Sequence, residues 1–392
     1  MIIGDKRALA YTTRVGEISK IEGADNIELI SVLGWKVIAK IGEFHEGDLC
    51  VYFEIDSKLP EKEWSEFMRA KHFKVKTMKL GKFGVISQGL ALPIGIFDVE
   101  IPNEENVDVT DLLGVTYSVE EDNARKKIDP NAKYKAMASR HQKIFKQPWA
   151  RWMMRREWGR RVMFFFFGRK KDKPRGFPTH FPFIHKTDEE RCENMGWILE
   201  NKEPWIKTQK IDGTSSTYIL ERKGKNKWEY YVCSRNVRQI TPSQKNYHTD
   251  IEGNVYWMMD EKYHIKDFLQ KYIIENGLNY ACLQGETAGP NLQGNPHKYK
   301  EICFFGYNLI RSDIGRINTL DAAKICNENG IPWVPIADEH YILPDTMEEL
   351  KLDADGPCLV GEGIREGWVY RSLDGQQSFK NVSRKYLLKH GD

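Results

Sequence analysis

The sequence has no apolar run that could cross a bilayer and no cysteine pattern typical of a disulfide framework. Its longest apolar run, 162–167, has six residues and basic flanks, whereas a spanning helix needs about 20. The seven cysteines are scattered and odd in number, with no Cys-x-x-Cys pair, and the ten histidines form no His-Glu-x-x-His motif. The first residues lack the apolar stretch of a secretory signal. We therefore expect no membrane span and no structural zinc site, and a reducing compartment such as the cytoplasm.

Charge is unevenly distributed along the 392 residues. The formal net charge is only +3, yet residues 125–175 hold 18 Lys and Arg residues against three acidic ones. Such a block on a mildly acidic body indicates that a polyanion is bound at one place. A solvated helix or a membrane-surface helix is the alternative interpretation of the same block.

The chain divides by composition into three parts. We expect a β-rich domain over 1–118, a basic aromatic linker over 119–185 and a mixed α+β domain over 186–392. Several short strands in about 100 residues, with few helices, favour a small closed barrel for the first part. Its predicted strands are 14–22, 27–39 and 49–55, followed by an alternating segment over 73–92. In the linker, 149–167 has the pattern of a basic amphipathic helix, and prolines 174, 178 and 182 predict an extended exit.

The third part has strands without a regular helix between each pair, which favours an antiparallel-rich α+β fold. A capping-box pattern over 187–190 predicts a helix start. Apolar spacing predicts one helix over 260–276, ended by Gly277, and a shorter helix over 318–329. The predicted strands are 214–220, 228–234, 301–310, 366–371 and 377–380.

The sharpest short motif is Lys210-Ile211-Asp212-Gly213. A lysine beside a glycine-bearing turn can act as a nucleophile if its amine loses a proton. Nearby positive charge and partial desolvation would lower its pKa from about 10.4. Gly213 would let the backbone pass close to a ligand. Taken alone, this tetrapeptide is common in solvated turns.

Five further motifs follow in a fixed order. Each has an ordinary structural explanation when taken singly, but six motifs in this order are not easily explained as independent accidents. They are Ser234-Arg235-Asn236, the glycine-bearing stretch 284–295, the aromatic segment 304–309, the segment 365–370 and Ser378-Phe379-Lys380.

This ordered set resembles the covalent nucleotidyltransferase superfamily of polynucleotide ligases and RNA capping enzymes, and is most similar to RNA ligases. The resemblance covers roughly 186–392 and implies an ATP-grasp-like ligase and capping-enzyme core. Segments 51–60 and 78–89 look like the N-terminal OB domain of the RNA ligase 5 group. Because only 12 residues follow Lys380, we expect no C-terminal OB domain, which separates this chain from DNA ligases and capping enzymes.

The resemblance implies an ATP-dependent joining of a 3′-hydroxyl to a 5′-phosphate. Lys210 would carry AMP, and Glu366, helped by Asp212, would hold Mg²⁺ or Mn²⁺ through water. Tyr307 would stack on adenine, with Phe305 left open as the alternative. The remaining implied nucleotide contacts are Gly213, Arg235 with phosphate or ribose, Glu286 with ribose hydroxyls, and Lys380 with the α-phosphate.

RNA, as a nicked duplex or a broken strand, is the implied partner. Basic residues beside Phe73 and Phe83 have the pattern of phosphate contact with stacking. We expect RNA contact from Lys74, Lys76 and Lys79 in the OB domain, and from Arg155, Arg156, Arg160 and Arg161 in the linker. We take a monomer as the default state and RNA repair as the setting.

Two departures from the family pattern keep alternatives open. Gln209 stands where many relatives have an acidic residue, and Lys380-Asn381-Val382 offers one lysine where some RNA ligases have two. Arg384 or Lys385 are the positions that would compensate. The alternatives are an RNA capping guanylyltransferase with the same lysine chemistry, and an inactive OB-type RNA-binding protein.

Overall fold

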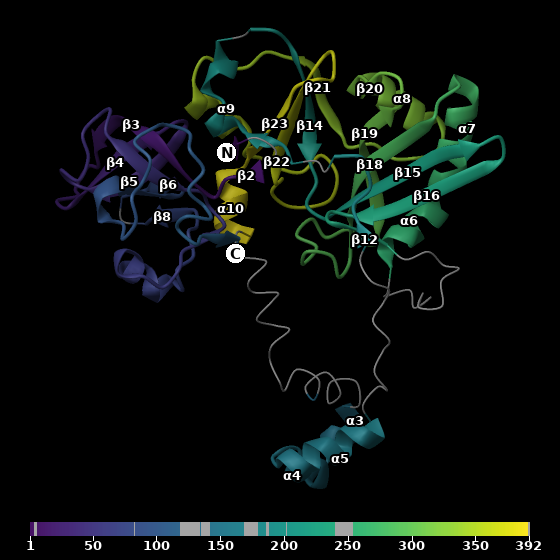
Figure 1. The fold of residues 1–392 in the computed structure, drawn as a ribbon, viewed down its shortest axis with the longest axis horizontal. Coiled ribbons are helices and arrows are strands. Elements are labelled where there is room, and N and C mark those ends of the chain that lie inside the picture. Colours follow the sequence, from purple (N-terminus) through teal and green to yellow (C-terminus); the bar gives the residue numbers. More distant parts are fainter. Residues whose placement is uncertain are drawn as a thin grey trace.

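The computed structural model describes the chain apart from 4–5, 82, 118–133, 135–141, 168–178, 186–187, 201, 240–253 and 391–392. The predicted domain boundaries after 118 and before 186 fall at residues outside this description, and they stay predictions. Figure 1 shows an N-terminal β region, a C-terminal region with two sheets, and a group of three helices, α3 to α5, below them.

The N-terminal region is a five-stranded antiparallel sheet in the order β10-β6-β3-β4-β5. Strand β10 also contacts β5, and Gln88 N–H donates to Lys36 O at 2.9 Å, so the two sheet edges meet. The expectation of an N-terminal OB-type barrel is confirmed. Its strands are β3 (Ala10–Lys20), β4 (Ile27–Val32), β5 (Trp35–Lys40), β6 (Leu49–Phe53) and β10 (Leu90–Pro93).

Shorter elements fill the rest of this region. They are β1 (Ile2–Ile3), β2 (Lys6–Arg7), β7 (Ser57–Lys58), β8 (Met78–Leu80), β9 (Val85–Ser87), β11 (Thr116–Tyr117), and the 3₁₀ helices η1 (Glu63–Lys71) and η2 (Ile94–Ile96).

Two details of the predicted barrel are wrong. The segment 27–39 forms two strands instead of one, because Leu33 adopts a left-handed conformation (φ 53°) and starts a two-residue turn. Phe73 is only 4% exposed and packs beneath Arg69 in a core cluster that also holds Phe53 and Met68, so its ring is not available to stack on a base.

The C-terminal region has two sheets, as the α+β prediction requires. The larger runs β12-β17-β16-β15-β18-β19-β20, and the smaller runs β13-β23-β22-β14-β21. The larger contains β12 (Thr179–His180), β15 (Thr214–Gly224), β16 (Lys227–Ser234), β17 (Val237–Arg238), β18 (Tyr280–Ala288), β19 (Cys303–Arg311) and β20 (Gly315–Arg316). The smaller contains β13 (Glu190–Arg191), β14 (Trp205–Lys210), β21 (Ile336–Tyr341), β22 (Gly367–Ser372) and β23 (Ser378–Val382).

Helices α6 (Val255–Tyr263), α7 (Ile265–Asn276) and α8 (Thr319–Glu328) pack on the larger sheet. The predicted helix over 260–276 is therefore interrupted: His264, left-handed at φ 49°, ends α6 and precedes α7. Gly277 caps α7 as predicted, since its N–H bonds Ile273 O and Ile274 O. The helices beside the smaller sheet are α9 (Met347–Asp353) and α10 (Arg384–His390).

The predicted helix start at 187–190 is wrong. Thr187 lies outside the described residues, and Glu190–Arg191 form β13, parallel to β23. Two short 3₁₀ turns follow, η3 (Cys192–Asn194) and η4 (Gly196–Leu199). The acidic side chains have tertiary partners instead of capping a helix: Asp188 pairs with Lys380, and Glu189 with Arg371.

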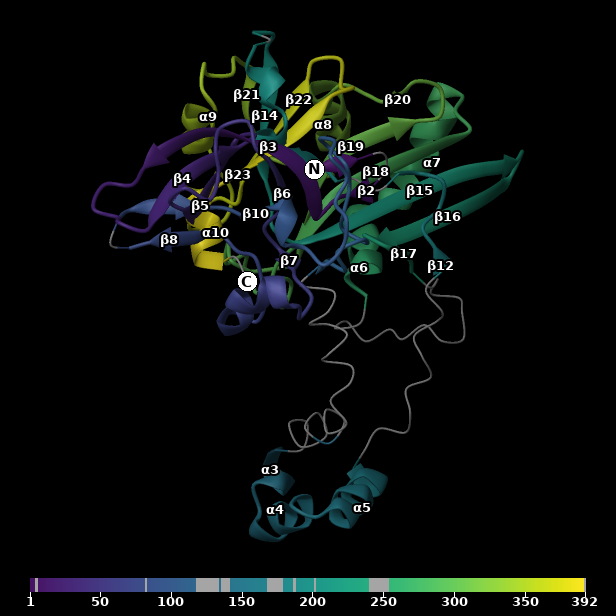
Figure 2. The same ribbon diagram turned by 60° about the vertical axis from the view of Figure 1, so that its left-hand side comes forward.

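The predicted helix over 149–167 is also divided in two. Helices α4 (Pro148–Met154) and α5 (Glu157–Phe167) are separated by Arg155 and Arg156. Together with α3 (Gln142–Phe145) they pack around their own small core of Tyr134, Phe145, Ala150 and Met163. We call α3, α4 and α5 the helical lobe; Figure 2 shows it apart from the two β regions.

Asn194 and Glu193 join the barrel to the smaller sheet. The Asn194 side-chain oxygen accepts from Trp35 Nε1 at 2.7 Å and from the Tyr11 hydroxyl at 3.2 Å. Glu193 O accepts from Gly34 N–H at 2.8 Å, and its carboxylate forms a fully buried ion pair with Lys351 at 2.6 Å. These contacts fix the barrel against the sheet that carries Lys210.

We predict that Gly34→Ala loosens this contact. A Cβ at Gly34 would lie 2.8 Å from Glu193 Cα and O, backbone atoms that cannot move alone. Urea denaturation should show a loss of about 1–3 kcal/mol, as for other overpacked sites. The control is Gly95→Ala, where a Cβ meets nothing within 4 Å. Equal stability of the two variants would contradict the importance of this contact.

Candidate functional site

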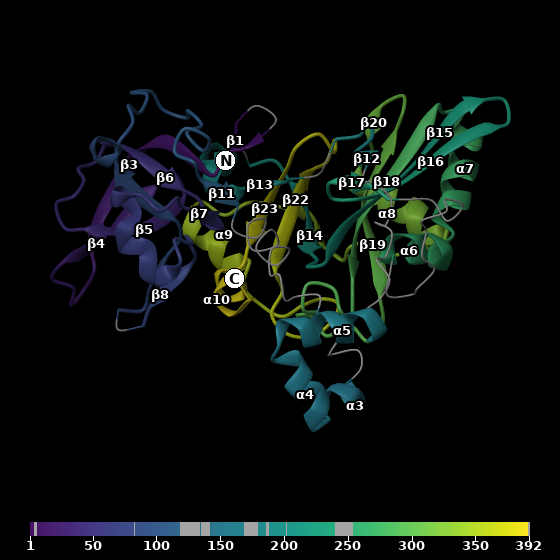
Figure 3. The same cartoon turned by 60° about the horizontal axis from the view of Figure 1, so that its bottom comes forward.

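The connection from β14 to β15 brings Lys210 and Asp212 into a cavity between the two C-terminal sheets. Lys210 ends β14, and Thr214 begins β15 in the other sheet. Residues 210–213 all line the cavity, and Ile211, 4% exposed, also packs in the core beneath it. A Cβ on Gly213 would lie 2.3 Å from Thr287 O, so glycine is required here by a neighbouring strand. Figure 3 shows β14, β22 and β23 between the barrel and the larger sheet.

The cavity has a volume of about 480 Å³ and is lined from several elements. Sequence-predicted residues that line it are Lys210, Asp212, Gly213, Arg235, Glu286, Tyr307, Glu366 and Lys380. Phe305, the alternative to Tyr307, instead packs in the core beside Tyr299 and is 8% exposed. The structure therefore gathers eight of the nine predicted nucleotide contacts in one place.

Lys210 and Glu366 form the central ion pair. Strand pairing sets Lys210 opposite Gly367, which follows Glu366, and Lys210 Nζ lies 2.7 Å from Glu366 Oε1. Gly367 has φ 155°, and a Cβ there would lie 2.1 Å from Asn381 O, so this strand start also needs glycine. The other Glu366 oxygen, Oε2, is buried and has no hydrogen-bond partner.

The lowering of the Lys210 pKa by nearby positive charge stays a prediction, because carboxylates dominate among the protein groups around this amine. Burial does lower the pKa of Lys210, but the carboxylates of Glu366, Glu286 and Asp212 raise it more, so the net pKa lies above the ordinary lysine value. The amine is therefore protonated until negative charge around it is offset.

Two of the carboxylates around Lys210 have raised pKa values, which means that their charged forms are disfavoured. Burial, followed by Glu366, raises the pKa of Asp212 to about 6, while Tyr386 donates its hydroxyl to this carboxylate. Burial also raises the pKa of Glu286 to about 8, despite the opposing charge of Lys210.

This donor set fits a hydrated divalent cation. No three His, Cys, Asp or Glu side chains converge as a ready-made metal site in the part of the chain that the structure describes. Mg²⁺ usually keeps several waters and needs only one or two carboxylates from the protein. The unpartnered Oε2 of Glu366 and the nearby Asp212 meet that need.

The carboxylate of Asp188 pairs with two of the cations that line the cavity, Lys380 and Arg235. Asp188 lies 3.2 Å from both Lys380 Nζ and Arg235 Nη2. Burial lowers the pKa of Lys380 to about 8, although Asp188 opposes the shift. These charges hold the two groups assigned to phosphate side by side.

Several lining residues were missed from the sequence. Asp188 and Glu189 lie in the acidic segment that was interpreted as a helix cap. Arg371 is 2% exposed, bonds Thr208 Oγ1 at 3.1 Å and lies 5.8 Å from the Tyr307 ring. Tyr117 comes from β11 in the N-terminal region, and no sequence signal marked it.

The residues at the two departures from the family pattern, Gln209 and the cations after Lys380, have partners outside the cavity lining. Gln209 is buried, and its side-chain oxygen accepts from Leu359 N–H. Arg384 pairs with Glu348, and Lys385 with Asp355. Neither of these cations lines the cavity, so neither supplies the second lysine of the motif.

The predicted RNA-binding residues lie elsewhere. Lys76 and Lys79 are exposed in the barrel region, and Lys74 is half-buried. Arg155, Arg156 and Arg161 are exposed on the helical lobe, whereas Arg160 is half-buried and lies over Tyr134. Among the described residues, no helix is long and apolar enough to cross a membrane.

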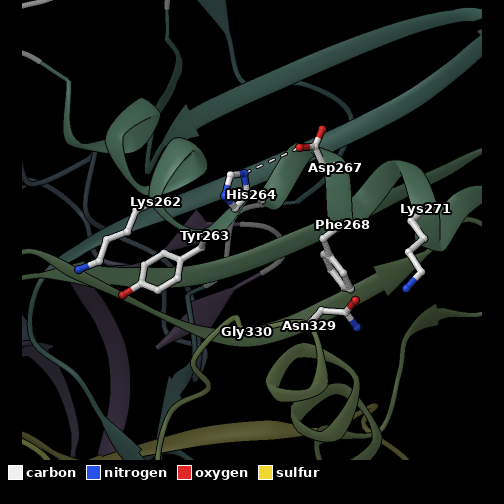
Figure 4. Close-up of a pocket in the computed structure, with 8 residues that line it drawn as sticks. All are labelled: Lys262, Tyr263, His264, Asp267, Phe268, Lys271, Asn329 and Gly330. Carbon is white, nitrogen blue, oxygen red and sulfur yellow. Dashed lines mark ion pairs between the residues drawn. The ribbon is translucent and has the colours of Figure 1, made fainter.

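A second, shallower cavity of about 310 Å³ contains none of the predicted site residues. Figure 4 shows its lining side chains on α6, α7 and the end of α8, with His264 and Asp267 3.9 Å apart. It lacks the convergence of charges seen around Lys210.

Comparisons with known proteins agree with the two-part architecture. An RNA ligase family model matches residues 203–387, and an OB-fold domain model matches 9–94. The two matches, together with the solved structures they agree with, support an ATP-dependent RNA ligase with an N-terminal OB domain. As an RNA ligase it carries its OB domain before the ligase core. No curated protein matches it in sequence.

Solved structures of Naegleria gruberi RNA ligase match this ligase over nearly its full length. An apo form with one aspartate replaced by alanine has 29% identity and a TM-score of 0.74, with 99% of both chains covered. A glutamate-to-alanine variant with ATP and Mn has 28% identity and a TM-score of 0.73, covering 98% of this chain and 100% of that one. A lysine-to-methionine variant with AMP and Mn has 29% identity, a TM-score of 0.73 and the same coverage.

We predict that the Glu286→Gln variant loses less stability than the wild-type protein as pH rises, measured without added metal. Because folding raises the pKa of Glu286 from 4.5 to about 8, the native state binds the extra proton between these values. Native stability therefore falls as pH rises through this window. Urea denaturation at pH 5 and 8 should show the variant gaining about 1–3 kcal/mol over wild type. Exposed Glu339→Gln is the control; parallel curves for all three proteins would contradict the buried charge.

Proposed function

We propose that this RNA ligase uses ATP to join a 3′-hydroxyl to a 5′-phosphate, with Lys210 as the nucleophile. The observation that carries the proposal is one half-buried amine, that of Lys210, 2.7 Å from Glu366, in a cavity that Tyr307, Glu286 and Lys380 also line. Its relatives were solved with ATP and Mn or with AMP and Mn, which supports a nucleotide and a divalent cation here.

In the first step, the Lys210 amine attacks the α-phosphorus of ATP. A P–N bond forms, the P–O bond to pyrophosphate breaks, and Glu366 Oε1 is the nearest acceptor for the amine proton. A bound Mg²⁺ or Mn²⁺ would offset the carboxylate charge and polarise the α-phosphate. Lys380 and Arg235, drawn together by Asp188, face the phosphate charge.

In the later steps, the adenylate passes to RNA. The 5′-phosphate oxygen of RNA attacks the lysyl-bound phosphorus and releases the amine; the 3′-hydroxyl then attacks the activated 5′-phosphate and releases AMP. Two exchanges replace one difficult substitution, because AMP is a better leaving group than an oxide.

Tyr307 is proposed as the adenine platform and Glu286 as the acceptor for ribose hydroxyls. Tyr307 lines the cavity, while Phe305 is in the core. Lys74, Lys76 and Lys79 on the OB domain are proposed contacts for the RNA backbone. A monomer stays the default state and RNA repair the proposed setting, and the seven free thiols support a reducing compartment.

We predict that Lys210→Ala abolishes covalent labelling by α-³²P-ATP, because the other lysine that lines the cavity, Lys380, is paired with Asp188 and is assigned to the phosphate charge instead of to attack. Lys271→Ala, an exposed lysine on α7, is the control and should label like wild type. Labelling is followed on denaturing gels with ATP or GTP and Mg²⁺. A GMP adduct in preference to AMP would favour a capping enzyme, and no adduct with either would favour an inactive RNA-binding protein.

We predict that Tyr307→Ala raises KM for ATP in lysine adenylation by roughly 5- to 150-fold, the range for loss of one base stack. Tyr307→Phe keeps the ring and should stay within about threefold of wild type. Steady-state adenylation at varied ATP measures both. A large KM rise for the phenylalanine variant would show that the hydroxyl, 3.4 Å from Ser215 Oγ, matters more than stacking.

A further inference from the structure

The helical lobe carries a dense positive charge that the adenylation chemistry does not use. Residues 142–167 contain seven Lys and Arg residues and one acid, Glu157. Exposed Arg155, Arg156 and Arg161 lie where α4 meets α5. Arg161 is tied to Glu157 at 2.8 Å, so one cation is partly offset. The remaining charge is complementary to a polyanion.

Indole rings are interleaved with these arginines. Trp152 and Trp158 are 51% and 53% exposed, although large aromatic residues normally bury most of their surface. The lobe has a separate core around Phe145, Ala150 and Met163, to which neither indole belongs. The two rings are therefore dispensable for packing of the lobe. We call Trp152, Arg155, Arg156, Trp158 and Arg161 the α4–α5 corner.

The corner holds its rings in a defined arrangement. Trp152 and Trp158 meet edge to face, with centroids 6.0 Å apart and an angle of 81°. Arg156 lies 3.8 Å above the Trp152 ring, so this ring face already accepts a flat, delocalised group. Gly159 allows the close approach of the helices, because a Cβ there would lie 2.2 Å from Met153 O. Rings held this way lose little freedom when a base stacks on them.

We propose that the α4–α5 corner binds unpaired segments of the RNA substrate. The arginine forks would contact phosphates and the indoles would stack on unpaired bases, the combination typical of single-strand binding. This inference rests on the proposed function for its substrate, but it assigns the lobe a separate role in holding RNA.

A lipid surface fits the same corner less well. Seating Trp152 in acyl chains would carry the stacked Arg156 guanidinium with it, at a desolvation cost. The feature that favours lipid is the exposure of Phe165 and Phe166, at 83% and 69% on α5. The two occupants therefore depend on different side chains, and substitution can separate them.

The test measures binding of a fluorescent single-stranded 12-mer RNA by anisotropy, using the full chain. Trp152→Ala with Trp158→Ala should weaken binding by at least roughly tenfold. Arg155→Gln with Arg156→Gln should weaken binding and reduce the slope of log affinity against log salt. The matched control, Phe165→Ser with Phe166→Ser, should bind RNA like wild type. Circular dichroism and trypsin resistance verify that each lobe remains folded.

Other outcomes overturn the proposal. Unchanged RNA affinity in the tryptophan variant removes the corner as a binding site. An equal loss for a blunt RNA duplex shows that unpaired bases are not the target. Binding to phosphatidylserine vesicles that only the phenylalanine variant loses, with RNA affinity unaffected by the tryptophans, assigns the lobe to lipid. Lys210 labelling by ATP is measured in parallel: its absence in wild type would overturn the adenylation proposal, while the RNA-binding result is judged on its own.

Discussion

Three carboxylates around the half-buried amine of Lys210 set the main electrostatic constraint on this ligase. Glu366, Glu286 and Asp212 stabilise the charged form of Lys210, and burial, together with the repulsion between these carboxylates, raises the pKa of Glu286 and Asp212. Such an arrangement is unfavourable in isolation, because burial penalises every ion. Positive charge entering the cavity would balance it, which is what the proposed role of Lys210 as a nucleophile requires.

The rest of the fold holds that arrangement in place. Lys210 and Glu366 come from paired strands of one sheet, while Glu286 and Tyr307 come from the other. Gly213 and Gly367 allow the backbone to approach Thr287 and Asn381 at the two points where a side chain would clash. The cavity is therefore formed by the facing of two sheets, and its charges cannot separate without disturbing both.

The OB domain contributes to this arrangement more directly than a flexible RNA-binding appendage would. Asn194 and Glu193, immediately after β13, bond Trp35, Tyr11 and Gly34 of the barrel. Strand β13 pairs with β23, which carries Lys380. Tyr117, paired through β11 to β7, lines the same cavity as Lys210. Barrel and cavity are thus joined by hydrogen bonds that lie only a few residues from Asp188, the partner of Lys380.

The sequence alone determined the fold class and the set of residues that gather around Lys210, because short motifs require particular side chains and strand patterns follow local alternation. The sequence could not decide whether Phe305 or Tyr307 lines the cavity, because the register between β18 and β19 shifts at Gln284 and Gly285. Nor could it show that Asp188 and Glu189 pair with cations instead of capping a helix. Only tertiary structure decided the sign of the Lys210 pKa shift, because that sign depends on charges from three distant segments meeting in one buried volume.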